Sequence, residues 1–328
     1  MTDILIRTSG HAGHITLNRP QALNALTWGM CLAIESALDD WKDNPKITLI
    51  IIDGAGDRAF CSGGDIAEMY ATGKRGDYDY GQRFWRDEYR LNEKIFNYPK
   101  PIVTFLQGFT MGGGVGVGCH GSHRVVCENS QIAMPECTIG LVPDVGGSLI
   151  LARAPGHCGE FLGLTGDRMD AGDAIYAGFA DHYVPFDQWG DVKTHLIDTG
   201  QPDIPAHAAP ASRLHDWQGD IDTWFTNGTD NPATQHAQKL MGRNAPLAMA
   251  VARKIIGTVR QNPCIKTALD HEFRYTYRCG TQGDFIEGIR AAIIDRDRQP
   301  KWQPITNEQI AAMTAPLGAR ALQWEEQQ

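Results

Sequence analysis

The sequence predicts an α/β layered core followed by a helical C-terminal lobe. Within the first 199 residues, short apolar runs typical of strands alternate with segments whose apolar residues recur at helical spacing. Beyond residue 233 the periodic segments are all helical, at about 233–242, 246–260, 264–279 and 283–296. The stretch between these parts opens as GQPDIPAHAAPAS, which is typical of a linker or surface loop. We therefore expect a core over 1–199, a linker or surface segment over 200–232 and a helical lobe over 233–328.

The N-terminal part of the core should hold two strands, a helix and a third strand. The two strands are expected to be antiparallel, because apolar and polar residues alternate on both sides of a glycine-containing turn: Ile4, Ile6, Ile15 and Leu17. Thr27 can cap a helix whose apolar residues recur every three or four positions until Pro45: Met30, Ile34, Leu38 and Trp41. The continuous apolar run at 47–52 is typical of a strand buried on both faces.

A glycine-containing loop, AFCSGGDI at 59–66, follows this strand and precedes a short helix. The N–H groups at a helix N-terminus have no intrahelical acceptor, so such a loop can bind an anion or an oxyanion. The polar, turn-rich stretch at 72–80 then predicts an excursion over the surface.

The next helix, expected at about 81–97, carries a carboxylate on its apolar face. Glu88 shares one stripe with three apolar residues: Phe84, Leu91 and Ile95. Burying a carboxylate is costly unless it is paired or used. Glu88 therefore either has a function, or pairs with Arg90 or Lys94, or leans out at the helix edge.

The central stretch 100–148 carries the densest set of candidate site residues. The expected strands are 102–106 and 124–127; the GGG triplet at 112–114 follows the first of them, and Glu136 follows the second. Asp144 stands shortly before a further glycine pair. Glycines let a backbone approach a ligand closely, and carboxylates presented by tight turns suit acid, base or nucleophile roles. We interpret the stretch as an acyl-thioester site.

The rest of the core should consist of short elements, namely helices at 149–155 and 160–164, a helix capped by Asp170 and ended by Gly178, and a strand at 180–184. The chain from Pro304 onward is polar, and we expect it to be loosely held.

Composition limits the classes of function. The net charge of -9 and the pI near 5.6 argue against a nucleic-acid binder. Residues 253–301 are locally basic, with ten Lys or Arg against six Asp or Glu, which suits either a nucleotide phosphate or a solvated helical surface. The N-terminus has no signal-peptide pattern, and the glycines in 103–119 make a poor membrane helix. The eight cysteines contain no CxxC pair, so we expect a reduced, cytoplasmic protein. From the charge and the missing membrane helix we expect no nucleic-acid and no membrane partner.

The absence of two common motifs excludes two classes of active site. The chain has no G-x-S-x-G nucleophile elbow and no P-loop. Two glycine segments, each after a buried strand, could instead aim one N–H group each at a single oxygen. These donors are the residue before the Gly63-Gly64 pair and the middle glycine of the GGG triplet. Such an oxyanion hole contributes about 10²–10³ in rate per donor, whereas the structural alternative is that the glycines allow close packing.

Taken together, these motifs resemble the enoyl-CoA hydratase/isomerase (crotonase) superfamily over about residues 4–300. The resemblance is strongest in LNRPQALNAL at 17–26, FCSGGDI at 60–66, the GGG loop and the PEC-IGL-PDVGG pattern at 135–147. Within the superfamily the chain is most similar to a hydrolase subgroup, through R-D-E-Y-x-L-N around Glu88 and M-P-E-x-x-I-G-L-x-P-D-V-G-G. The resemblance implies a crotonase-like ββα spiral core and a thioesterase that releases CoA from a short β-hydroxyacyl-CoA. The expected substrate is 3-hydroxyisobutyryl-CoA, an intermediate of valine catabolism.

The resemblance also implies residue roles. The N–H groups of Ser62 and Gly113 would form the oxyanion hole. Glu136 would attack the thioester or act as a base on water, and Asp144 would orient or protonate. Glu88 would hold the substrate hydroxyl, and further substrate contacts are expected at Gly63, Gly64, Asp65 and Gly112. The structural alternatives are a helix N-cap for Asp144 and a surface turn residue for Glu136.

One position departs from the pattern of the hydratases. Hydratases carry a glutamate two residues after the GGG triplet, where this chain has Gly116. Adding water across a C=C bond normally needs that second carboxylate, so hydratase activity is not expected. An isomerase can act with one glutamate, but Asp144 and Glu88 would then be surplus. The alternative outside enzymes is a silent scaffold or RNA-associated member, against which the acidic balance and the intact carboxylates argue.

The resemblance implies no metal and no cofactor, because CoA is part of the substrate. Arg19 and Lys254 are candidates to bind the CoA phosphates. Members of the superfamily usually form trimers through the helical C-terminal region, so a homotrimer or another homo-oligomer is expected.

Overall fold

The computed structural model of the protein describes residues 2–324, which form two compact units. Of the described residues, the first unit combines 2–64, 91–133 and 168–216, and the second combines 65–90, 134–167 and 217–324. Each unit is therefore assembled from separated stretches of sequence. The expected sequential division at residues 199 and 232 is of another kind and stays a prediction.

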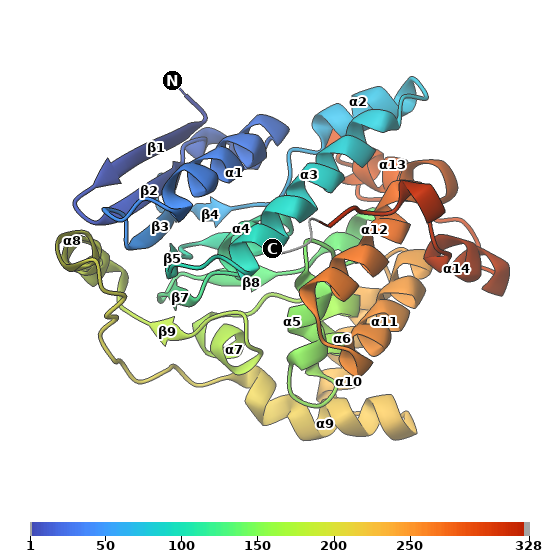
Figure 1. Ribbon diagram of the computed structural model, residues 1–328. Coiled ribbons are helices and arrows are strands. Elements are labelled where there is room, and N and C mark those ends of the chain that lie inside the picture. Colours follow the sequence, from blue (N-terminus) through green and yellow to red (C-terminus); the bar gives the residue numbers. More distant parts are fainter. Residues whose placement is uncertain (1, 325–328) are drawn as a thin grey trace. The chain divides into compact units, whose positions relative to one another are not determined.

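The first unit is built on two β-sheets (Figure 1). The six-stranded sheet has the order β1-β2-β3-β5-β7-β9, with the bounds β1 Ile4–Ser9, β2 Ala12–Leu17, β3 Leu49–Gly54, β5 Ile102–Phe105, β7 His123–Val126 and β9 His182–Tyr183. β1 and β2 are antiparallel, and the other neighbours are parallel. The three-stranded parallel sheet consists of β4 Ala59–Cys61, β6 Phe109–Met111 and β8 Gln131–Ala133. The expected N-terminal hairpin is confirmed, and β4, β6 and β8 are strands that the sequence analysis did not identify.

Helices cover both faces of the larger sheet. α1 (Trp28–Lys42) begins at Thr27, whose side chain accepts a hydrogen bond from the N–H of Met30, as expected. Gly13 of β2 faces α1, because a Cβ atom there would lie 2.3 Å from a ring carbon of Trp41. The neighbouring residue Ala12 points the other way, into a cluster that includes Trp189, Val192 and Leu196 of α8 (Trp189–Thr199). The first unit also contains α4 (Gly113–Gly118) and α7 (Ala171–Tyr176), the latter capped by Asp170 as expected.

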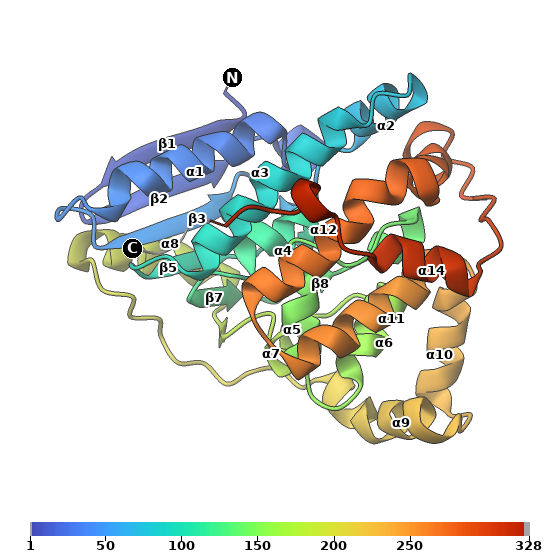
Figure 2. The same ribbon diagram turned by 45° about the vertical axis from the view of Figure 1, so that its right-hand side comes forward.

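The second unit is helical (Figure 2). Its helices are α2 Ala67–Lys74, α5 Gly147–Arg153, α6 Cys158–Thr165, α10 Pro232–Met241, α11 Pro246–Gln261, α12 Ile265–Gln282, α13 Phe285–Ile289 and α14 Asn307–Thr314, with a 3-10 turn at Glu136–Ile139 and a π-helical turn at Arg290–Ile294. α5 packs against α6, α11 and α12, and α14 packs against α11 and α12. The residues of α3 (Asp79–Phe96) and α9 (Arg213–Asn227) are divided between the two units. The helical C-terminal lobe of the prediction is confirmed in its element type.

Two helices correct the sequence analysis. α9 lies inside the stretch expected to be a linker or surface segment. Two of its apolar residues, Leu214 and Ile221, are two turns apart on the same face of the helix, and both are buried. α14 lies in the stretch expected to be loosely held. It begins with a capping box, in which Thr306 and Gln309 exchange side-chain and backbone hydrogen bonds. The sequence analysis missed both helices because the stretches that contain them are rich in polar and turn-forming residues.

All eight cysteines are free; seven of them are buried, where a thiol packs as a small apolar group, and Cys264 is exposed. Among the described residues, no helix combines the length and the apolar character needed to cross a membrane.

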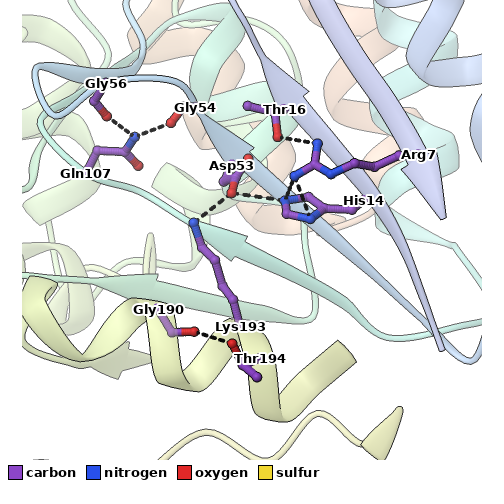
Figure 3. A network of polar contacts seen from close by, with 10 residues as sticks. All are labelled: Arg7, His14, Thr16, Asp53, Gly54, Gly56, Gln107, Gly190, Lys193 and Thr194. Carbon is purple, nitrogen blue, oxygen red and sulfur yellow. Dashed lines mark hydrogen bonds and ion pairs between the residues drawn. The ribbon is translucent and has the colours of Figure 1, made fainter. Parts of the chain in front are cut away.

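A buried polar network in the first unit joins β2, β3 and α8 (Figure 3). The Asp53 carboxylate accepts hydrogen bonds from His14 Nε2 at 3.0 Å and from Lys193 Nζ at 2.6 Å. Arg7 donates to His14 Nδ1 at 2.9 Å. Burial alone would raise the pKa of Asp53, but the hydrogen bond from His14 and the charge of Lys193 hold that pKa well below its ordinary value.

Replacing Asp53 by Asn is expected to lower the free energy of unfolding by about 3 kcal/mol at pH 7, because the charges facing a buried carboxylate lose their partner. The matched control is Asp39→Asn, whose 56% exposed side chain pairs with Lys94 and should contribute less than about 1 kcal/mol. Since the folded-state pKa of Asp53 is lowered, its contribution is present above about pH 4 and is lost as the pH falls toward the folded-state value. Urea unfolding measures the difference; equal losses in the two variants at pH 7 would contradict it.

Candidate active site

Four buried carboxyl groups lie together in the second unit. Glu88 comes from α3, Glu136 from the 3-10 turn, Asp144 from the segment before α5, and Glu272 from α12. Their exposed fractions are 2%, 4%, 3% and 0%. Their charges raise one another's pKa values, which requires that the groups be near each other. The structure therefore brings together the three carboxylates predicted from the sequence and adds Glu272.

The Asp144 carboxylate accepts a hydrogen bond from a tyrosine on a neighbouring helix. The Tyr89 hydroxyl of α3 donates a hydrogen bond of 2.7 Å to Asp144 Oδ2. The same hydroxyl lies 3.5 Å from Thr276 Oγ1 of α12. The structural alternative for Asp144, a helix N-cap, is wrong, because the N-cap residue of α5 is Gly146.

Glu272 takes the capping position instead. Its carboxylate accepts hydrogen bonds from the N–H of Gly146 at 2.8 Å and from the N–H of Ser148 at 3.0 Å, as well as from the Ser148 hydroxyl. These are the first amides of α5, which have no intrahelical acceptor. α12 thereby fixes the backbone immediately after Asp144.

Glu136 and Glu88 have carboxylate oxygens without a partner. Glu136 Oε2 and Glu88 Oε1 are buried and accept no hydrogen bond from the described residues. The pairing alternatives for Glu88 are wrong, because Arg90 pairs with Asp87 and Lys94 pairs with Asp39 and Glu35. The surface alternative for Glu136 is wrong as well, since this side chain is buried. A buried oxygen left without a partner costs free energy in the folded state, which is typical of a site prepared for a ligand or a reaction.

The cluster titrates far above the range of ordinary carboxyl groups. Burial raises the pKa of Asp144 to about 7, although the hydrogen bond from Tyr89 opposes the shift. Burial raises the pKa of Glu272 to about 8, against the hydrogen bonds from Ser148 and Gly146. Burial and then the charge of Asp144 raise the pKa values of Glu136 and Glu88 well above the ordinary value. Near neutral pH the cluster therefore holds both protonated and ionised carboxyl groups, as acid–base chemistry requires.

The GGG triplet lies in the first unit, at the start of α4. Gly112 has a φ of +50° and is followed by Gly113, the first residue of this buried helix. The N–H of Gly113 is therefore one of the amides that lack an intrahelical acceptor, as an oxyanion donor must be. The packing alternative holds for Gly114, where a Cβ atom would lie 2.4 Å from the carbonyl oxygen of Cys61.

The second expected donor, Ser62, follows β4 in the same unit. Its N–H donates to the carbonyl oxygen of Leu23 at 3.0 Å, so this amide already has an acceptor within the fold. Gly63 has a φ of +115°, and Gly64 pairs with Leu26 in an isolated bridge. Asp65 begins the second unit and is half-buried. The roles of these residues toward a substrate stay predictions.

The candidate phosphate-binding cations make contacts within the chain. In the first unit, Arg19 donates to the carbonyl oxygen of Ala25 at 2.6 Å and pairs with Asp3. In the second, Lys254 donates to Thr314 Oγ1 at 2.9 Å. Arg278 donates to the carbonyl of Ala315 beyond the end of α14. Part of the basic stretch at 253–301 therefore fastens α14, a role that was not considered from the sequence.

Tyr89 and Glu272 are the site residues that sequence reasoning missed. Glu272 lies on the buried stripe of α12 together with apolar and weakly polar residues: Ala268, Leu269, Tyr275, Thr276 and Cys279. The argument that identified Glu88, a carboxylate on an inward helical stripe, would also have identified Glu272.

No metal-ligand group of three or more His, Cys, Asp or Glu occurs within residues 2–324.

The sequence of this chain is similar to one family of known proteins. The sequence model of a family described as enoyl-CoA hydratase/isomerase matches residues 12–315. The chain is 36% identical to the mitochondrial 3-hydroxyisobutyryl-CoA hydrolase of Bos taurus, over 98% of this chain and 91% of that protein. It is 33% identical to the Homo sapiens protein of the same name, with the same coverage.

Two solved structures superpose closely. A crystal structure described as an enoyl-CoA hydratase from Rhodobacter sphaeroides 2.4.1 has a TM-score of 0.96 and 51% identity, covering 98% of this chain and 100% of that one. A structure described as a carnitinyl-CoA dehydratase from Mycobacterium thermoresistibile has a TM-score of 0.92 and 36% identity, with 99% of each chain covered. These similarities confirm the fold class expected from the motifs.

Proposed function

The chain belongs to the enoyl-CoA hydratase/isomerase family, and we propose that it is a thioesterase of this family that hydrolyses 3-hydroxyisobutyryl-CoA to 3-hydroxyisobutyrate and CoA. The observation that carries the proposal is the buried cluster around Glu136 and Asp144, which holds protonated and ionised carboxyl groups near neutral pH. Full-length similarity to proteins named 3-hydroxyisobutyryl-CoA hydrolase supports the choice of reaction and substrate. The name of the substrate points to a place in valine degradation.

The reaction needs a base, an acid and a site for an oxyanion. Water adds to the thioester carbonyl carbon while its proton passes to an ionised carboxylate. The negative charge that develops on the carbonyl oxygen is held by amide N–H groups. When the C–S bond breaks, a protonated carboxyl group delivers a proton to the leaving sulfur. Glu136 and Asp144 supply these two carboxyl functions in the proposal, and Glu88 accepts a hydrogen bond from the substrate hydroxyl.

We assign the oxyanion site to the N–H groups of Gly113 and Ser62. Gly113 is supported by its place at the start of α4. Ser62 would have to share its proton between the thioester oxygen and the carbonyl of Leu23. Gly63, Gly64, Asp65 and Gly112 line the substrate in this proposal. No metal or cofactor takes part in it.

A second candidate activity is hydration of an enoyl-CoA, because the structure with 51% identity is described as an enoyl-CoA hydratase. Gly116 argues against it. This residue lies in α4, where the resemblance places the second catalytic glutamate of the hydratases, and it offers no carboxylate.

The two activities are separated by their products. We expect 3-hydroxyisobutyryl-CoA and 3-hydroxypropionyl-CoA to release a free thiol with the enzyme, detected by a thiol reagent. Crotonyl-CoA should be neither cleaved nor hydrated. Loss of the enoyl absorbance of crotonyl-CoA without thiol release would favour the hydratase, and the absence of acyl-CoA binding in calorimetry would favour a non-enzymatic role.

The remaining expectations concern location and assembly. The hydrolases of Bos taurus and Homo sapiens are mitochondrial by name, whereas the cytoplasmic location expected for this chain stays a proposal. A homotrimer or another homo-oligomer is likewise proposed, and sedimentation would test it.

A further inference from the structure

Asn92 of α3 is fully buried, and its side-chain amide has no hydrogen-bond partner among the described residues. Both Nδ2 and Oδ1 lack a partner. The other three buried amide side chains of the described chain, those of Asn24, Gln107 and Asn244, each donate to a backbone carbonyl. A polar group that is buried without a partner lowers the stability of the folded state. No hydrogen bond within residues 2–324 therefore explains why an amide is buried at this position.

The same face of α3 carries a second group of this kind. Glu88 lies four residues before Asn92 in the R-D-E-Y-x-L-N pattern, and its Oε1 is buried and has no partner in the described chain either. Residues four apart on a helix are neighbours, with Cβ atoms about 5–6 Å apart, so α3 alone fixes their proximity. The helix thus presents an acceptor atom, from Glu88, beside the N–H donor of Asn92.

A hydroxyl group is the ligand that matches this pair of side chains. It has one O–H to donate and lone pairs that accept. It can therefore donate to Glu88 Oε1 while it accepts from the amide N–H of Asn92, and a water beside it can donate to Asn92 Oδ1. A purely apolar group would leave both side chains without a partner.

We propose that Asn92 is a specificity-determining residue, which binds the 3-hydroxyl of the acyl group together with Glu88. The assignment rests on the proposed hydrolysis, in which Glu88 accepts a hydrogen bond from this hydroxyl, and it adds the donor on the other side of the same oxygen. An acyl-CoA without the hydroxyl leaves the buried amide and the buried carboxyl group unpartnered, and such a site rejects the analogue that lacks the group. Asn92 thereby makes the enzyme select hydroxylated acyl groups.

The first test compares 3-hydroxyisobutyryl-CoA with isobutyryl-CoA, which lacks the hydroxyl. In Asn92→Leu, whose side chain has nearly the same size and shape, kcat/KM for the hydroxylated substrate should fall about tenfold, the effect of one lost hydrogen bond. The value for isobutyryl-CoA should stay the same or rise, because the variant buries no unpartnered amide. The matched control is Asn97→Leu, which changes an exposed residue just after α3, where Asn97 donates to Glu93 Oε1 at 3.0 Å. It should keep the wild-type ratio of the two substrates.

Stability separates this role from a structural one. Asn92→Leu removes no hydrogen bond of the described chain, so its midpoint of urea unfolding should equal or exceed that of the wild type. Asn92→Ala removes the amide without adding apolar bulk, and the ratio of the two substrates should fall in the same way. A variant that is less stable than the wild type and keeps the wild-type ratio would show that Asn92 serves the fold.

A second measurement does not depend on turnover. In the Glu136→Gln protein, calorimetry should show tighter binding of 3-hydroxyisobutyryl-CoA than of isobutyryl-CoA. Adding Asn92→Leu should reduce this preference about tenfold. Equal affinities in the presence of Asn92, or a preference that survives Asn92→Leu, overturn the inference. If the preference is lost as expected but the wild type cleaves no thioester, the proposed function fails while the assignment of Asn92 stands.

Discussion

Replacement of Glu136 by Gln is expected to lower kcat/KM for 3-hydroxyisobutyryl-CoA by about 10²–10⁴-fold, the range that general acid–base groups contribute. Glutamine has nearly the same shape, but it can neither attack the thioester nor exchange a proton with water or sulfur. The loss should therefore fall mainly on kcat, because uniform substrate binding is retained. Thiol release under steady-state conditions measures both parameters.

The folded state of this variant should be unchanged or slightly more stable. Glu136 Oε2 has no partner to lose, and an amide removes the cost of ionising a buried acid. The matched control is Glu68→Gln on α2, an exposed carboxylate, which should retain full activity. Near-normal hydrolysis by a folded Glu136→Gln protein would exclude Glu136 from the reaction.

Replacement of Asp144 by Asn is expected to abolish hydrolysis to a similar extent while stabilising the protein in neutral and alkaline solution. Burial raises the pKa of Asp144 to about 7 in the folded protein, whereas the unfolded chain has a value of about 4. Between these values the folded state binds more protons than the unfolded state, so the stability of the wild type falls as the pH rises. The variant lacks this titration.

The stability difference should accordingly be small at pH 4, grow by about 1.4 kcal/mol per pH unit and level off above pH 7. Urea unfolding of wild type and variant across this range measures it. The exposed control Asp39→Asn should show no such growth, because its side chain is 56% exposed and faces water. A variant that becomes less stable than the wild type as the pH rises would show that Asp144 is stabilised, not strained, as an anion.

The sequence by itself determined the class of elements and most of the chemistry. Periodicity located the hairpin at Ile4–Leu17, the helix that Thr27 caps and the inward stripe carrying Glu88, because these features depend on local spacing. The glycine-rich and acidic motifs identified Glu136 and Asp144, which the structure places in one cluster with Glu88.

Only the tertiary structure decided which groups surround those carboxylates. The partners of Asp144 lie 55 residues before it, in Tyr89, and those of the following turn lie on α12, where Glu272 is separated from Gly146 by 126 residues. The same holds for Ser62, whose amide is engaged by Leu23, and for α14, which cations of α11 and α12 fasten. The physical reason is that a pKa or an unsatisfied N–H depends on distances and burial, and the packing of remote segments sets both.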